Sequence, residues 1–136
     1  MHKRIEALAG QLALSDLEWM ALNPGPSLRY LTGLNFHLME RPLVFLVGKS
    51  GQVKVILPEL ERAKAANLPF DAEIIPFGDD PLTWNSVYKQ ALFEISGNSL
   101  RIGVEPTRLR FLELELLRQA LPESEIVDGS AALAEL

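Results

Sequence analysis

The chain has 136 residues, which is the size of one ordinary domain and leaves no room for a second. Thirteen basic against eighteen acidic residues give a formal net charge of −5 at pH 7, so nonspecific binding to a nucleic acid backbone has no electrostatic support. The absence of cysteine excludes disulfide bonds and thiolate metal sites, and no apolar run approaches the roughly 20 residues that span a bilayer. We therefore expect a soluble, cytoplasmic protein with no nucleic acid or membrane partner.

Hydrophobic periodicity predicts the first two elements. Apolar residues recur at the spacing of one helical face between positions 5 and 12, and the compact apolar run at 17–22 is typical of a buried strand. A tight corner with a short turn of helix is predicted next, because two prolines flank a glycine at the start of 23–33. We expect Ser27 to cap this turn, Gly33 to end it in the left-handed conformation, and Tyr30 to place its ring in the core.

The middle of the chain combines an irregular segment with two strands. Residues 34–42 follow neither the helical nor the strand period, which predicts an irregular loop. The strand-like runs at 43–47 and 53–57 flank a short glycine-containing segment, so they predict a β-hairpin. Residues 59–68 have the composition of a helix with an acidic first turn.

The second half of the chain alternates between short strands and helices. Strands are predicted at 73–77, 101–104 and 125–127, and a helix at 109–120 lies between the last two. Asp80 and Pro81 form a helix-start pair before a strong helical period that places one aromatic-rich face in the core. The aromatic residues expected in the core are Trp19, Trp84 and Tyr88.

This alternation predicts an α/β fold. We expect a single domain with a mixed central β-sheet of about five to six strands flanked by helices. Ser130 is expected to cap a final helix of about two turns, which ends with the sequence at Leu136. Because isolated helices shorter than roughly 12 residues are marginal in water, we expect the natural protein to continue.

Sequence patterns for catalysis or ion binding are weak. Gly48-Lys49-Ser50 has part of a phosphate-binding loop, but position 43 is Leu and a strand follows, so a hairpin turn is the better interpretation. The two histidines, His2 and His37, are not spaced as metal ligands or placed to serve a nucleophilic serine. Asp79-Asp80 is interpreted as a turn and helix cap in preference to a divalent-ion pair.

The segment 35–41 is the one place where a functional interpretation is preferred. It carries an aromatic residue, a histidine, an acid and an arginine in a loop beyond a rigid corner, and binding groups are often held on such loops. Phe36, His37 and Arg41 are therefore candidate contacts to a substrate or a partner protomer. The alternative is a solvated connection.

Four short motifs stand at 24–33 (PGPSLRYLTG), 40–42 (ERP), 101–105 (RIGVE) and 125–130 (EIVDGS). In content and order they resemble the creatinase/prolidase N-terminal domain, the non-catalytic front half of many Xaa-Pro peptidases. The resemblance covers nearly the whole chain. It implies the fold of that domain, with its ribonuclease H-like motif.

The resemblance also implies a catalytic domain outside this chain. In that family a C-terminal domain binds two divalent metal ions (Mn, Co or Zn) through two Asp, one His and two Glu, and none of those motifs occurs here. Residues 1–128 would form the N-terminal domain, and 129–136 would begin a linker helix to the catalytic domain. We therefore expect no catalytic residue, metal site or cofactor in this chain, and no peptidase activity from it alone.

For the full-length parent, the resemblance implies a metal-dependent Xaa-Pro dipeptidase or aminopeptidase acting on proline-containing dipeptides or peptides. The N-terminal domain would contribute to a homodimer and to one wall of the substrate cleft. Two alternatives stay open: the protein-binding domain of a non-enzymatic relative, or the N-terminal domain of creatinase.

Overall fold

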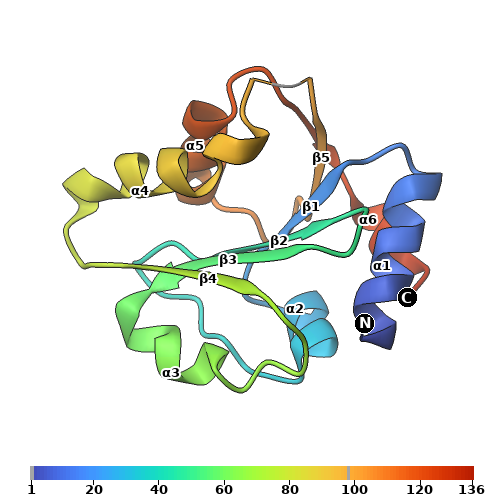
Figure 1. Ribbon diagram of the computed structural model, residues 1–136, viewed down its shortest axis with the longest axis horizontal. Coiled ribbons are helices and arrows are strands. Elements are labelled where there is room, and N and C mark those ends of the chain that lie inside the picture. Colours follow the sequence, from blue (N-terminus) through green and yellow to red (C-terminus); the bar gives the residue numbers. More distant parts are fainter. Residues whose placement is uncertain (1, 98) are drawn as a thin grey trace.

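A six-stranded sheet runs through the centre of the protein, with helices on both of its faces (Figure 1). This computed structural model describes residues 2–97 and 99–136. The strands are β1 (Trp19–Leu22), β2 (Val44–Gly48), β3 (Val53–Pro58), β4 (Glu73–Phe77), β5 (Arg101–Val104) and β6 (Glu125–Asp128). The helices are α1 (Lys3–Leu14), α2 (Pro26–Thr32), α3 (Arg62–Ala65), α4 (Trp84–Ala91), α5 (Phe111–Ala120) and α6 (Ser130–Ala134), with 3-10 turns η1 (Glu59–Glu61), η2 (Pro81–Thr83) and η3 (Phe93–Ile95). The predicted α/β fold with a mixed sheet is confirmed.

The strand order is β4-β3-β2-β1-β5-β6. Strand β2 runs antiparallel to both of its neighbours, whereas the other pairs are parallel. The predicted hairpin is therefore the pair of β2 and β3, and Gly48-Lys49-Ser50 lies at its turn. It follows that β1, β3, β4, β5 and β6 all end at the edge of the sheet where β2 begins. We call this the carboxyl edge.

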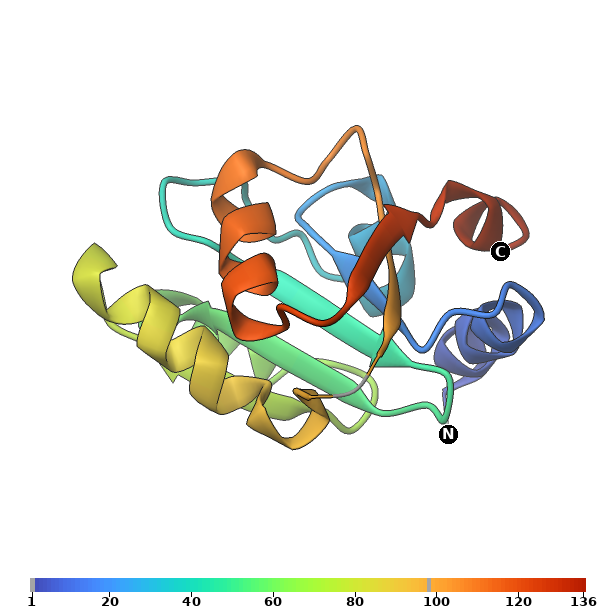
Figure 2. The same ribbon diagram turned by 90° about the horizontal axis from the view of Figure 1, so that it is seen from above.

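The sheet separates two hydrophobic cores. Because side chains alternate along a strand, Met20 and Leu22 of β1 point to one core while Trp19 and Ala21 point to the other. The first core is covered by α1, α2, α3 and α6, and the second by α4 and α5 (Figure 2). Burial on both faces explains why the central strands β1 and β2 read as continuous apolar runs in the sequence.

Close backbone approach explains the glycines in two of the motifs. A Cβ atom on Gly129 would lie 2.6 Å from Cε of Met20, and one on Gly103 would lie 2.9 Å from Cδ1 of Leu17. The Cα atom of Gly103 would be 3.0 Å from the same Gly129 Cβ. The two glycines thus give the fully buried Met20 room between β5 and the start of α6.

Most of the predicted local structure is confirmed. Helix α1 buries the predicted face of Ile5, Leu8, Ala9 and Leu12. Asp80 caps η2, with Oδ1 accepting a hydrogen bond from the Leu82 amide at 3.0 Å. Gly33 ends α2 with φ of 71°, the left-handed conformation. The three aromatic residues assigned to the core are buried: Trp19, Trp84 and Tyr88.

Two predicted helix caps are wrong. Helix α2 begins at Pro26 after an extended Gly25, so Ser27 lies inside the helix and its hydroxyl bonds elsewhere. Helix α6 begins at Ser130 itself, because the Asp128 carboxylate accepts hydrogen bonds from the Ser130 amide at 2.9 Å and from its hydroxyl at 2.6 Å. In both cases a neighbouring carboxylate takes the serine hydroxyl, which leaves it no capping role.

Three other expectations need correction. Tyr30 is 45% exposed, because Leu28 and Leu31 occupy the buried side of α2, and the Arg4 guanidinium lies 4.2 Å above its ring. The helix predicted at 59–68 is a 3-10 turn followed by a short α3 that ends at Ala65. The helix predicted after Asp80 and Pro81 ends at Ala91 and is followed by the 3-10 turn η3. No helix within the described residues has the length and apolar character needed to cross a membrane.

Candidate functional site

The four motifs meet at the carboxyl edge of the sheet. Residues 24–33 follow the end of β1, 101–105 finish one residue beyond β5, and 125–130 run from β6 into α6. The motif at 40–42 leads into β2, which begins at the same edge because it is antiparallel. In sheets of this kind, ligands bind outside the carboxyl ends of the strands. The carboxyl edge is therefore the candidate functional site.

A hydrogen bond joins two of these motifs across 78 residues of sequence. The Ser27 hydroxyl in α2 donates to Oε2 of Glu105 at 2.7 Å, because the parallel pairing of β1 and β5 brings the two strand ends together. The Arg108 side chain lies across Gly25, where a Cβ would come within 3.1 Å of its Cδ. The corner after β1 is thus fixed against the segment after β5.

Asn23 fixes the same corner to the start of β2. Its side chain is fully buried, and its Nδ2 donates to the Leu43 carbonyl at 3.1 Å. A hollow of about 550 Å³ lies on the outer side of the corner, lined by Gly25, Pro26, Arg29, Tyr30 and Asn35. The corner therefore presents a firmly held, partly cationic surface.

The first half of loop 34–42 is anchored in the core. The Phe36 ring is 5% exposed and packs on Phe45 with 5.2 Å between ring centroids. Lys64 of α3 donates from Nζ to the Asn35 carbonyl at 2.8 Å and lies 5.4 Å from the Phe36 ring centroid. Of the candidate contacts, Phe36 thus serves as an anchor, whereas His37 is exposed and Leu38 beside it is 58% exposed.

Arg41, the third candidate, pairs with an acid across the carboxyl edge. Its Nε donates to Oδ1 of Asp79 at 2.7 Å. This hydrogen bond from Arg41 holds the pKa of the Asp79 carboxyl below its ordinary value, and the same bond raises the pKa of the guanidinium. The sequence interpretation of Asp79 as a turn residue gave no sign of this partner, since 38 residues separate the two.

A buried ion pair at the start of α5 holds the second half of the loop. Glu113 is fully buried, and Arg110 donates to it twice, from Nε to Oε1 at 3.0 Å and from Nη2 to Oε2 at 2.7 Å. The Arg110 guanidinium also donates to the Met39 carbonyl at 2.6 Å and to the Arg41 carbonyl at 3.3 Å. Glu113 Oε2 accepts from the Leu43 amide at 3.3 Å. Figure 2 shows the start of α5 beside the loop.

Neither Arg110 nor Glu113 was recognised from the sequence, although a signal was present. The apolar stripe of the predicted helix at 109–120 places position 113 on the buried side, where a carboxylate is costly without a partner. An arginine three residues earlier supplies that partner. The Tyr88 phenol lies in the same core: burial raises its pKa well above the ordinary value, the Glu113 charge raises it further, and the Arg110 charge opposes both.

The chemistry of this edge suits recognition. Within residues 2–97 and 99–136 no group of three or more His, Cys, Asp and Glu side chains is arranged to hold a metal ion. Large apolar side chains are exposed on segments that enter or leave the carboxyl edge: Leu38, Leu60, Leu82 and Phe111. These side chains offer apolar contact area on several segments at this edge.

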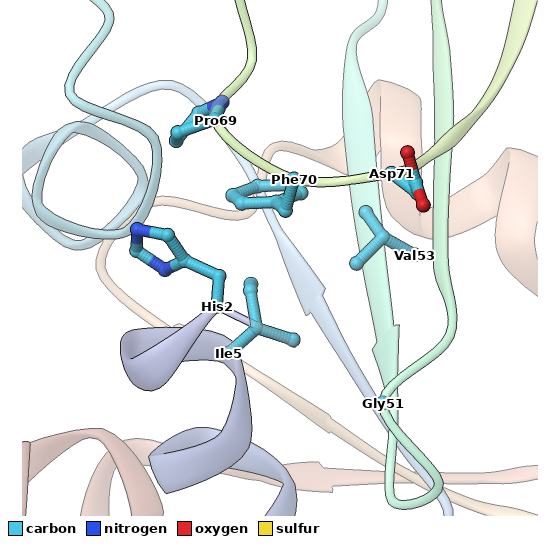
Figure 3. A pocket seen from close by; sticks show the side chains of 7 residues that line it. All are labelled: His2, Ile5, Gly51, Val53, Pro69, Phe70 and Asp71. Carbon is cyan, nitrogen blue, oxygen red and sulfur yellow. The ribbon is translucent and has the colours of Figure 1, made fainter.

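A further hollow lies at the opposite edge of the sheet (Figure 3). It has a volume of about 570 Å³, and its walls come from the start of α1, the β2–β3 turn and the segment before β4. Figure 3 shows His2 and Ile5 facing Phe70 and Val53, and the His2 ring meets Phe70 edge-on at 5.6 Å. None of the four motifs contributes to it.

Comparison with known proteins gives a family match over almost the full length. A family model described as the creatinase/prolidase N-terminal domain matches residues 4–136. No individually curated protein sequence matches the chain.

Several solved structures share the fold. The N-terminal domain of Xaa-Pro dipeptidase from Lactobacillus brevis superposes with a TM-score of 0.82 at 17% identity, covering 98% of this chain and 100% of that one. The creatinase/prolidase N-terminal domain of an X-Pro dipeptidase from Streptococcus pyogenes has a TM-score of 0.81 at 16% identity, with 100% of both chains covered. A prolidase from Thermococcus sibiricus has a TM-score of 0.81 at 18% identity, and the match covers 98% of this chain but 35% of that one. This chain therefore spans about one third of the longer relative.

Proposed function

Because this chain belongs to the creatinase/prolidase N-terminal domain family, we propose that it is the non-catalytic N-terminal domain of a metal-dependent Xaa-Pro dipeptidase or aminopeptidase. The observation that carries the proposal is the family match over residues 4–136. The Thermococcus sibiricus prolidase supports it, because that chain extends well beyond the part that this domain matches. In this proposal residues 129–136 begin the connection to a catalytic domain.

Hydrolysis of the Xaa-Pro bond is assigned to that catalytic domain, together with two divalent metal ions. The carboxylates of this chain do not fit such a pair of ions, since they form no suitable cluster among the described residues. No residue of this chain is therefore given a part in a chemical step. The contribution proposed for this chain is to bind the substrate or a partner protomer and to shape the substrate cleft.

The carboxyl edge would supply one wall of the substrate cleft and contacts in a homodimer. The exposed leucines and Phe111 on segments at this edge would supply apolar contacts to a second protein surface. His37 would reach the substrate or the partner protomer directly, whereas Phe36 and Arg41 would serve the contact by holding the loop in place. Loops held by a rigid scaffold commonly carry such binding groups.

The test uses the full-length product of the gene that encodes this chain. We expect it to cleave Xaa-Pro dipeptides in the presence of manganese. Replacing Leu38 with Ser should raise KM at least about fivefold, because a contact residue of this size contributes on the order of 1 kcal/mol to binding. Leu14→Ser is the matched control, since Leu14 is also an exposed leucine, 81% accessible, but ends α1 at the opposite edge of the sheet.

Two outcomes would count against the proposal. A full-length product without Xaa-Pro hydrolysis would contradict the assigned activity. Equal KM values and an equal dimer fraction for Leu38→Ser, His37→Ala and Leu14→Ser would contradict the role of the loop while leaving the family assignment intact.

A further inference from the structure

We propose that Arg110 is a positioning residue that, through its buried pair with Glu113, holds loop 34–42 in the conformation that presents His37 and Leu38. This inference deepens the function proposed above and rests on it for its catalytic consequence. Its structural part rests on the geometry of this chain alone.

The pair contacts the loop at regular intervals. Its three backbone partners are the Met39 carbonyl, the Arg41 carbonyl and the Leu43 amide, which belong to every second residue of the segment that leads into β2. Arg110 supplies the donors and Glu113 the acceptor, so one ion pair satisfies groups of both kinds. A planar guanidinium can bind a carboxylate with one edge and carbonyl oxygens with its remaining N–H groups, which an ammonium cannot do.

Burial makes this contact specific. Glu113 has no exposed side-chain surface, and the Arg110 side chain is 29% exposed. A charge in this position is costly unless it is paired and hydrogen-bonded, and an apolar pair of similar volume usually serves stability as well or better. The two residues are therefore explained better by their contacts to the loop than by core stability. Holding the loop is the task that they perform and an apolar pair would not.

The loop is tied at its other end by different groups. Phe36 is anchored on Phe45, and Lys64 holds the Asn35 carbonyl. His37 and Leu38 therefore form the exposed part of a loop that is anchored on both sides. Such a preordered loop loses little conformational entropy when it contacts a ligand. Removing one anchor should make His37 and Leu38 mobile and weaken their contact with the substrate or partner.

The decisive variant replaces both members of the pair, Arg110→Met with Glu113→Leu, so that no uncompensated charge is left in the core. We expect it to unfold cooperatively, while hydrogen exchange of the Leu43 amide becomes at least tenfold faster and the ¹⁵N NMR order parameters of 38–41 fall. Arg110→Lys keeps the positive charge but lacks the planar guanidinium with its several N–H donors, so loop 34–42 should become more mobile in this variant too. The matched control is Arg118→Met with Glu115→Leu, a pair with the same spacing on α5 whose side chains are 59% and 37% exposed and which has no hydrogen bond to loop 34–42 among the described residues.

Exchange is measured on the purified chain, and kinetics on the full-length protein. In the full-length protein the double variant should raise KM for Xaa-Pro dipeptides more than it lowers kcat, and the control pair should change neither. Unchanged exchange at the Leu43 amide together with unchanged order parameters in 38–41 would overturn the inference. Faster exchange with unchanged KM would overturn the positioning role. Absence of activity in the wild-type full-length protein would instead contradict the proposed function, while the exchange result would still decide whether the pair holds the loop.

Discussion

Gly33 offers the sharpest test of the corner after β1. It ends α2 with φ of 71° and ψ of 4°, and its amide donates to the Arg29 carbonyl at 2.8 Å. A Cβ atom built on Gly33 meets nothing within 4 Å. The cost of a side chain at this position therefore comes from the left-handed backbone alone, without any packing clash.

That cost can be estimated. An L-residue in the left-handed conformation loses roughly 1–2 kcal/mol, and for a chain of this size each kcal/mol lowers the melting temperature by about 3–4 °C. We expect Gly33→Ala to melt about 3–8 °C below the wild type. Gly33→Asn should lose less than the alanine variant, because asparagine visits this conformation more readily than other residues with a Cβ.

Gly10 provides a control at which substitution by alanine should raise stability. It lies within α1, and a Cβ there also meets nothing within 4 Å. Alanine should stabilise the helix by about 0.5–1 kcal/mol, because glycine is a poor helix former. Thermal unfolding followed by circular dichroism gives both values. If Gly33→Ala and Gly10→Ala shifted the melting temperature in the same direction, the argument from backbone conformation would be refuted.

Three further predictions concern buried or paired side chains. Tyr88→Phe should raise the free energy of unfolding by about 1 kcal/mol, because the buried hydroxyl has no hydrogen-bond partner among the described residues. Since the folded-state pKa of the phenol is raised, the stability of the wild type is intact below pH 10 and falls as the pH rises further. Chemical denaturation at increasing pH should show a shallower fall for the variant. Arg41→Met should return the depressed pKa of Asp79 towards its ordinary value of 3.8. In the wild type the contribution of this pair to stability is present above that value and is lost as the pH falls through the lower folded-state pKa. An NMR titration that gave the same Asp79 pKa in both proteins would contradict the hydrogen bond. Gly129→Ala should lower the free energy of unfolding by about 1–3 kcal/mol by overpacking against Met20, and by less in a Met20→Ala background. Equal losses in both backgrounds, measured by urea unfolding, would show that the contact with Met20 is not the cause.

The regular elements were predictable because their causes are local. The apolar face of α1, the glycine-containing turn between β2 and β3, and the Asp80-Pro81 start all act within a few residues of sequence. The cap predicted at Ser27 failed because its competing acceptor is distant in sequence, whereas the cap predicted at Ser130 failed because a nearer acceptor, two residues away, takes the hydroxyl. Each serine meets a carboxylate, Glu105 in one case and Asp128 in the other, and the first of these is 78 residues away.

The loop at 35–41 was predictable from the sequence, but the residues that anchor it were not. The mixed character of residues 35–41 indicated a loop with binding groups, and the structure puts that loop at the edge where all four motifs meet. The anchors could not be seen, because Arg110, Glu113 and Asp79 come from elements far along the chain. Tyr30 was expected inside because it is aromatic, yet on a seven-residue helix with Leu28 and Leu31 already buried it faces outward.

Hydrolysis of Xaa-Pro dipeptides by the purified 136-residue chain and by the full-length gene product, each with added manganese, tests the central claim most directly. The account predicts turnover by the full-length protein and none by this chain, whose described residues form no cluster suited to a metal ion. Turnover by the isolated chain, or a gene product that ends at Leu136, would contradict it.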